Sequence, residues 1–161
     1  ISGSFNQEQK LIYNIVLKAQ NMAIKSCLVD QTLIKIHSIA VRYIVKGLLD
    51  AKILKGTLEN NIKNEKYKKF YMHNTGHWLG LDVHDPCPYV IDGNPVKLKP
   101  GMIFTVEPGI YISNDSGVDK KYQNIAIRIE DDILITKNGP YVLSQAVPKT
   151  VSDIETLMSH G

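Results

Sequence analysis

The chain has 161 residues, of which 43% are hydrophobic and 22% are charged, so its composition favours one globular domain and argues against disorder. The net charge is only +3, and acidic residues are interspersed among the lysines, so we predict no nucleic-acid partner. No apolar run reaches the ~18–20 residues that cross a bilayer, so we predict no membrane partner.

The two cysteines, Cys27 and Cys87, lie far apart and form no metal or redox motif. We expect free thiols and a cytoplasmic protein. The polar N-terminal residues do not resemble a signal peptide, although the chain begins with Ile1 rather than Met. We place no domain boundary within residues 1–161.

The first third of the sequence predicts two helices. Asn6 followed by Gln9 has the pattern of a capping box, and apolar residues then recur at helical spacing. A second helix is expected to begin near Asp30 or Thr32, again with a continuous apolar face. The Asn- and Lys-rich stretch after Gly56 is predicted to be a loop.

The remainder of the chain has short β-type runs separated by Gly and Pro. The expected strands are Phe70–His73, His77–Leu81, Met102–Glu107, Ile125–Glu130 and Asp132–Thr136. A short final helix is expected over Ser152–Met158. Helices followed by a mostly antiparallel sheet predict an α+β fold.

Three motifs concentrate residues that bind metals or transfer protons. Residues 71–85 hold three of the five histidines. Residues 98–111 include Glu107, which ends an apolar run and precedes Pro-Gly. Residues 125–132 include Glu130 at the end of an alternating run. The sequence therefore directs attention to these three segments.

Both glutamates are expected to point inward, where a carboxylate needs a proton, a cation or a metal. Strand alternation also places Arg128 on the same face as Glu130. Taken singly, each residue also fits a plainer role, such as a packed histidine or a surface ion pair between Arg128 and Glu130. Together, histidine and carboxylates suit Mn, Fe(II), Co or Zn, and a two-metal site activates water for hydrolysis.

In this order, the three motifs closely resemble those of the Xaa-Pro aminopeptidase (aminopeptidase P) family of pita-bread metallopeptidases. The resembling segments are His73-x-x-x-His77-Trp78-Leu79-Gly80-Leu81-Asp82-Val83-His84-Asp85, Leu98-x-Pro100-Gly101-Met102-x-x-Thr105-Val106-Glu107-Pro108-Gly109-x-Tyr111 and Ile127-Arg128-Ile129-Glu130-Asp131-Asp132. The likeness extends from about Phe5 to Leu157. Trp78 after a ligand-type histidine favours aminopeptidase P over prolidase.

The resemblance implies a role for each motif residue. His77, Glu107 and Glu130 are expected to bind metal, and Glu107 is also expected to act as the general base. His84 is expected to contact the substrate carbonyl or stabilise the tetrahedral intermediate. His73 is expected to line the pocket for the substrate proline. Supporting or substrate-contacting roles are expected for Arg128, Tyr111 and Trp78.

The resemblance also implies the cofactor and the substrate. The complete family site holds two divalent ions, for which we favour Mn, and two of its aspartate ligands come from strands before the first helix. No Asp precedes Asp30 here, so we expect a partial pita-bread catalytic domain with ligands for about one ion. The expected reaction is hydrolysis of the N-terminal X-Pro peptide bond, impaired or absent in this chain alone.

Two other functions stay open at this point. One is a non-catalytic pita-bread remnant that binds peptide or protein, and the other is a prolidase-type dipeptidase. For a protein partner, the alternatives are a homo-oligomer or a complementing N-terminal fragment.

Overall fold

The computed structural model describes residues 3–159. Its helices are α1 (Gln7–Lys25), α2 (Leu33–Asp50), α3 (Leu58–Lys63) and α4 (Val151–Ser159). Its strands are β1 (Val90–Ile91), β2 (Asn94–Pro95), β3 (Ile103–Val106), β4 (Gly109–Ile112), β5 (Ile125–Arg128), β6 (Asp131–Thr136) and β7 (Gly139–Val142). The predicted α+β class is confirmed.

The starts of α1 and α2 follow from their capping residues. Asn6 accepts a hydrogen bond from the Gln9 backbone, and the Gln9 side chain accepts one from the Asn6 backbone, which confirms the predicted capping box. Thr32 caps α2, so the second of its two expected starts is correct. The side-chain oxygens satisfy backbone N–H groups that the first helical turn leaves unpaired.

The prediction of a loop after Gly56 is wrong, because α3 begins two residues later, at Leu58. Thr57 caps this helix. Asn61 is fully buried, and its side-chain amide donates to the carbonyls of Lys55 and Thr57. The sequence shows no apolar helical pattern here, because a hydrogen-bonded amide occupies a buried position that an apolar side chain usually takes.

The centre of the fold is a long antiparallel ribbon that is interrupted once. β3 pairs with β6, β4 pairs with β5, and β7 pairs with the other edge of β6. The register is the same on both sides of the interruption, with Val106 opposite Asp131 and Gly109 opposite Arg128. Pro108 lies in the gap, and it has no N–H with which to continue the ladder.

An irregular segment runs along the free edge of β3 and β4. Its backbone joins the ribbon through the pairs Leu79–Ile103, His77–Thr105, Thr75–Glu107 and Phe70–Tyr111. The strands predicted over residues 70–73 and 77–81 are therefore wrong as regular strands, although the segment does lie alongside the sheet. Only part of the ladder forms, with one isolated bridge between Trp78 and Phe104.

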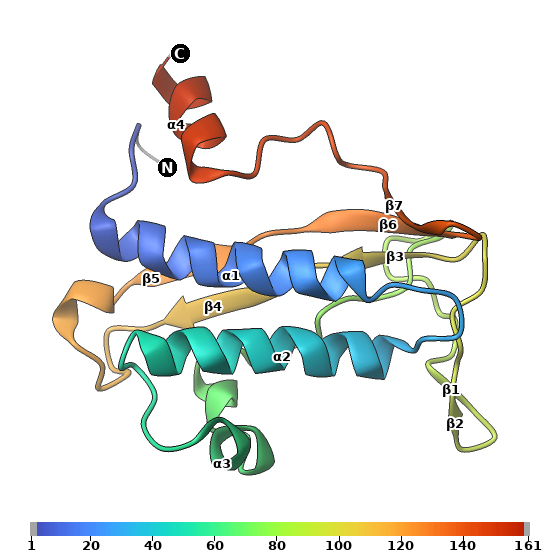
Figure 1. The fold of residues 1–161 in the computed structure, drawn as a ribbon, viewed down its shortest axis with the longest axis horizontal. Coiled ribbons are helices and arrows are strands. Elements are labelled where there is room, and N and C mark those ends of the chain that lie inside the picture. Colours follow the sequence, from blue (N-terminus) through green and yellow to red (C-terminus); the bar gives the residue numbers. More distant parts are fainter. Residues whose placement is uncertain (1–2, 160–161) are drawn as a thin grey trace.

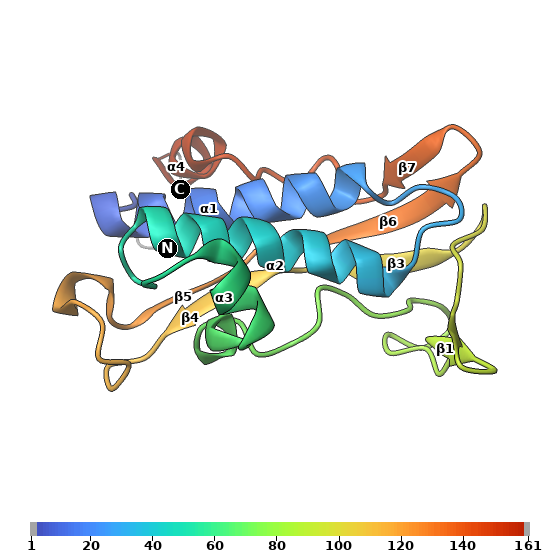
Figure 2. The same ribbon diagram turned by 60° about the horizontal axis from the view of Figure 1, so that its bottom comes forward.

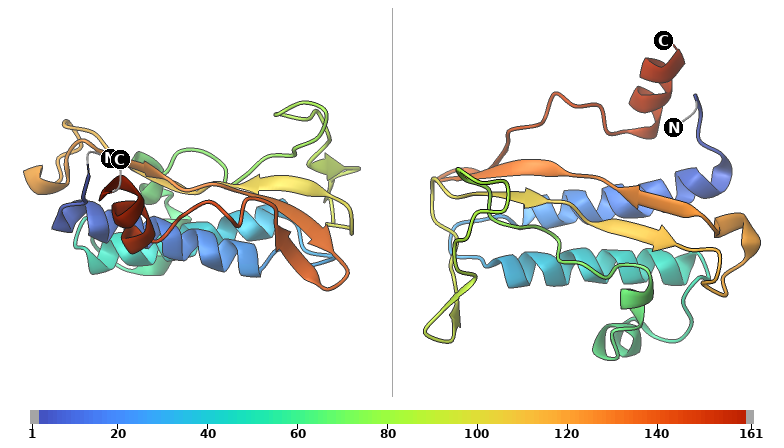
Figure 3. Two further views of the ribbon diagram at one scale, coloured as in Figure 1. Left: turned by 90° about the horizontal axis from the view of Figure 1, so that it is seen from above. Right: turned by 180° about the vertical axis from the view of Figure 1, so that it is seen from behind.

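The remaining expected strands and the final helix are confirmed, with ends shifted by a few residues. The helices α1 and α2 lie side by side across one face of the ribbon (Figures 1 and 2), and the view from behind shows the strands in front of both helices (Figure 3). Within residues 3–159, no helix combines the length and hydropathy that a bilayer crossing requires.

The core between the two layers has two clusters of buried side chains. One lies around Ile44, Leu48 and Ile110. The other includes Phe104 and Ile133. Residue 107 follows a strand of the second cluster and precedes a strand of the first, so both clusters fix the backbone at the interruption of the ribbon.

Candidate metal centre

Two carboxylates face each other where the ribbon is interrupted. The shared register of the two ladders places Glu107 opposite Glu130. Like charges directly opposite in an antiparallel pair are destabilising. Glu107 is only 8% exposed, as predicted, whereas the inward orientation predicted for Glu130 is wrong because the residue is exposed. Glu130 continues the alternation of β5, whose exposed side carries Ala126 and Arg128.

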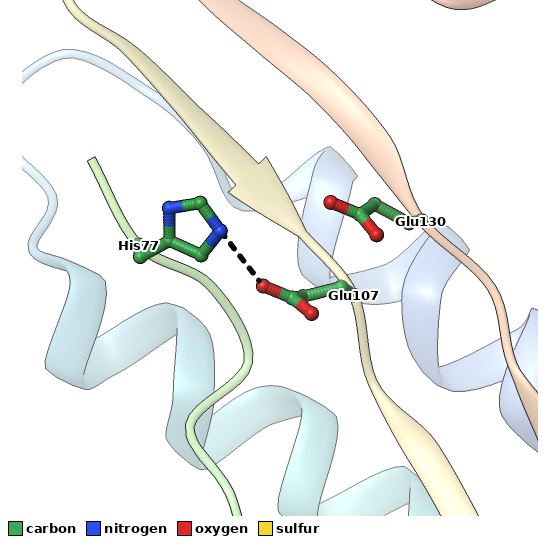
Figure 4. Close-up of side chains that lie close together, drawn as sticks. All are labelled: His77, Glu107 and Glu130. Carbon is green, nitrogen blue, oxygen red and sulfur yellow. Dashed lines mark ion pairs between the residues drawn. The ribbon is translucent and has the colours of Figure 1, made fainter. Parts of the chain in front are cut away.

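His77 approaches this pair from the irregular segment. Its Nε2 atom lies 3.3 Å from Glu107 Oε1 (Figure 4). Its Nδ1 atom lies 3.0 Å from the Trp78 carbonyl oxygen, which can only accept, so Nδ1 carries the proton in the neutral ring. The Nε2 lone pair then points toward a carboxylate oxygen. Two such groups need a proton or a cation between them.

The geometry and chemistry of these three residues fit one divalent cation. One ligand atom from each of His77, Glu107 and Glu130 lies within 4.8 Å of the other two. Two atoms that bind the same ion at 2.0–2.2 Å are at most about 4.4 Å apart. Small side-chain movements would therefore bring all three ligand atoms within bonding distance of one ion. Imidazole with carboxylates is a donor set for Mn, Fe(II), Co or Zn.

Neighbouring side chains fix the orientation of Glu107. The Thr105 hydroxyl donates to Glu107 Oε1 at 3.0 Å and accepts the His77 backbone N–H at 3.0 Å. Arg128 Nη1 lies 3.4 Å from Glu107 Oε2. Both carboxylate oxygens are thus engaged, and one hydroxyl links two of the three candidate ligands.

The pKa of Glu130 responds to the carboxylates around it. Partial burial of its carboxyl group raises the pKa of Glu130, although the residue as a whole is exposed, and the charges of Glu107 and Asp132 raise it further. A cation between the two facing carboxylates would offset this repulsion.

The three residues open onto a pocket of about 490 Å³. Its lining residues are His73, Asn74, Gly76, His77, Val83, His84, Tyr89, Glu107, Arg128 and Glu130. The ring of His84 lies with its centroid 4.1 Å from that of His77. The structure therefore brings the three motif histidines and Arg128 together around the carboxylates.

A directed hydrogen-bond chain joins Arg128 to His73. Arg128 Nε donates to the Tyr111 hydroxyl at 2.7 Å, and that hydroxyl lies 3.0 Å from His73 Nε2. His73 Nδ1 lies 2.7 Å from the Asn74 carbonyl, so Nδ1 donates and Nε2 accepts from Tyr111. Burial lowers the pKa of His73, which favours this neutral ring.

Trp78 does not reach the pocket around the carboxylates. Its side chain is 5% exposed and packs edge-on against Phe104 at 6.0 Å between centroids. The indole also stacks on Tyr89 and donates to the Pro88 carbonyl. This position gives Trp78 a role in packing the segment that carries His77 rather than in contacting a ligand at the carboxylates.

Sequence reasoning assigned no role to three supporting residues. Thr105 lies two residues before Glu107 on a strand, so side-chain alternation was a usable signal that both face the same way. Thr75 is 2% exposed and His37 lies on α2, remote in sequence from every motif. Thr75 lies within residues 71–85, which was a usable signal, whereas no sequence signal points from His37 to the site.

The comparisons with known proteins agree with this geometry. The family model of metallopeptidase family M24 matches residues 1–137. The chain is 45% identical over 159 residues to a Xaa-Pro aminopeptidase from Haemophilus influenzae, and 41% identical over 158 residues to one from Escherichia coli. These matches cover 99% and 98% of this chain, but only 37% and 36% of the relatives.

Solved structures give the same result. The aminopeptidase PepP of Pseudomonas aeruginosa superposes with a TM-score of 0.96 and 46% identity, over 98% of this chain and 36% of that one. Escherichia coli aminopeptidase P with the inhibitor Pro-Leu superposes with a TM-score of 0.93 and 41% identity, also over 98% of this chain and 36% of that one. The expected aminopeptidase-like fold is thus confirmed, and the chain spans about a third of its relatives' length. The chain belongs to metallopeptidase family M24.

Proposed function

We propose that this chain carries part of the metal centre of an aminopeptidase P-type enzyme, which hydrolyses the N-terminal X-Pro bond of a peptide. The observation that carries the proposal is the pair of facing carboxylates, Glu107 and Glu130, with the His77 lone pair directed at one of them. The relatives named Xaa-Pro aminopeptidase support the reaction. The substrate would be a peptide with proline in second position.

The proposed cofactor is Mn, with His77, Glu107 and Glu130 holding about one ion of a two-ion site. A bound divalent ion would polarise water and stabilise negative charge on the attacked carbonyl oxygen. Two aspartates outside this set would complete the site, as the family resemblance implies. We propose that a complementing N-terminal fragment supplies them, and that residues 1–161 form one partial catalytic domain.

The chain's own residues would then divide the proton transfers and the binding. Glu107 would accept a proton from water and return it to the proline nitrogen as that nitrogen leaves. His84, exposed on the pocket wall, would donate a hydrogen bond to the substrate carbonyl. The neutral ring of His73, fixed through Tyr111 and Arg128, would line the side that receives proline.

The convergence of all three ligand residues supports a catalytic role over a non-catalytic remnant. The named relatives support aminopeptidase P over a prolidase-type dipeptidase. The cytoplasmic location expected from the cysteine content stays a prediction.

A chimera tests the proposal. This chain would replace the matching segment of Escherichia coli aminopeptidase P, and hydrolysis of an X-Pro peptide would be measured with added Mn²⁺. We expect turnover that falls at least about 100-fold in Glu107→Gln, because the proton-transfer group is lost. Glu59→Gln, on the exposed surface of α3, should change nothing. A folded, metal-loaded chimera without activity would contradict the proposal, as would full activity of the isolated chain.

A further inference from the structure

Thr75 is the point at which the helical layer meets the metal centre. It lies two residues before His77 in the irregular segment and is 2% exposed. Its carbonyl accepts the backbone N–H of Glu107 at 2.6 Å. It is therefore joined to one candidate ligand through the chain and to another through a hydrogen bond across the ribbon.

The other polar atoms of Thr75 are held by a histidine on α2. His37 Nδ1 lies 3.2 Å from the Thr75 backbone N–H and 2.9 Å from its hydroxyl. The Thr75 hydroxyl also lies 2.6 Å from the hydroxyl of Tyr71, which is fully buried.

The direction of each hydrogen bond follows from the backbone donor. Because His37 Nδ1 accepts the Thr75 N–H, Nδ1 carries a lone pair and the ring proton is on Nε2. The Thr75 hydroxyl must then donate to Nδ1, and the Tyr71 hydroxyl must donate to Thr75. Burial, with smaller effects from His73 and Lys68, lowers the pKa of His37 and favours this neutral ring. The arrangement has one consistent set of proton positions.

The position of His37 makes this network a link to rigid structure. His37 lies in the second turn of α2, whose buried face packs with α1 in the core. The segment around Thr75, in contrast, has only a partial ladder with β3. The imidazole thus supplies a side-chain anchor where regular strand pairing is incomplete.

We propose that His37 is a positioning residue, whose Nδ1 lone pair fixes Thr75 and thereby sets the spacing between His77 and Glu107. This inference rests on the proposed function for its consequence in metal binding. His37 itself touches neither the candidate ligands nor their pocket.

Four variants of the 161-residue chain separate the lone pair from the bulk of the ring. His37→Asn keeps an acceptor near the Nδ1 position, His37→Gln moves its amide toward the Nε2 position, and His37→Leu removes both. Lys35→Leu, exposed on the same helix, is the matched control. Two quantities are measured: amide hydrogen exchange at Thr75 and Glu107 in metal-free protein, and the dissociation constant for Mn²⁺.

In Leu and Gln variants, we expect the two amides to exchange at least about tenfold faster and Mn²⁺ to bind about tenfold more weakly, as for other supporting contacts of metal ligands. Exchange at Ile44 in α2 should stay unchanged, which a general loss of stability would not allow. The Asn variant and the control should match the wild type. If His37→Leu does not fold, the comparison of His37→Asn with His37→Gln still tests whether the Nδ1 lone pair matters.

The inference would be overturned if the Thr75 and Glu107 amides exchanged at the same rate in His37→Asn and His37→Gln. Unchanged exchange in all His37 variants would overturn it too. A wild-type chain that binds no Mn²⁺, while the exchange pattern still follows the lone pair, would overturn the proposed function alone. The positioning of Glu107 by His37 would then stand without the metal.

Discussion

The two sides of the candidate metal centre are built in different ways. Glu107 and Glu130 lie between paired strands, whose ladders fix their register on both sides of the interruption. The histidines of residues 71–85 lie on a segment without regular strand structure, held by a partial ladder, two threonine hydroxyls and His37. The comparison teaches that side-chain contacts take over where the backbone ladder is incomplete, so the two sides should respond differently to mutation.

The largest effect is expected on the ribbon side, at a buried ion pair. Asp131 follows Glu130, is 1% exposed, and accepts from Lys149 Nζ at 2.7 Å and Ser144 Oγ at 2.5 Å. Lys149→Met leaves a buried carboxylate unpaired, so we expect the free energy of unfolding to fall by ~3–5 kcal/mol in urea titrations. Lys46→Met breaks an exposed i,i+4 pair and should cost under about 0.5 kcal/mol. Similar losses of unfolding free energy in both variants would show that the pair between Lys149 and Asp131 is not a stabilising buried ion pair.

A smaller effect is expected on the histidine side, where a glycine allows close contact with β3. A Cβ atom on Gly76 would lie 1.8 Å from the Thr105 carbonyl oxygen. Gly76→Ala must push the segment away from the strand, so we expect a loss of ~1–3 kcal/mol in unfolding free energy and weaker Mn²⁺ binding. Met72→Ala, at an exposed position of the same segment outside the pocket, serves as the control. Wild-type stability of the alanine variant at Gly76 would show that the segment is not tightly fitted.

The smallest effect is expected where the two sides meet, at the Thr105 hydroxyl. Thr105→Val removes the group that links the His77 backbone to Glu107 Oε1. We expect a stability loss of ~1 kcal/mol and Mn²⁺ affinity lowered about tenfold, measured by calorimetry. Thr105→Ser keeps the hydroxyl and should retain most of the affinity. Equal losses in both variants would assign the effect to packing instead.

Local features of the fold could be predicted from the sequence. The capping box at Asn6 and the cap at Thr32 gave the helix starts, because these signals depend only on neighbouring residues. The helix after Gly56 could not be predicted, because its buried anchor, Asn61, is a polar residue whose partners are backbone carbonyls.

The candidate site was predictable as a set of residues but not as an arrangement. Resemblance of the motifs gave the three candidate ligands, and an inward Glu107 followed from its apolar strand. That Glu130 faces Glu107 depends on the register between strands about 20 residues apart, which no local pattern reports. The contribution of His37 depends on a tertiary contact between α2 and the histidine segment.

Calorimetric titration of the 161-residue chain with Mn²⁺ tests the shared metal site most directly. The account predicts binding of about one ion, and a loss of affinity of more than about 100-fold in each of His77→Ala, Glu107→Gln and Glu130→Gln, since each removes a direct ligand. Wild-type binding that survives all three substitutions, or no binding by the wild-type chain, would contradict it.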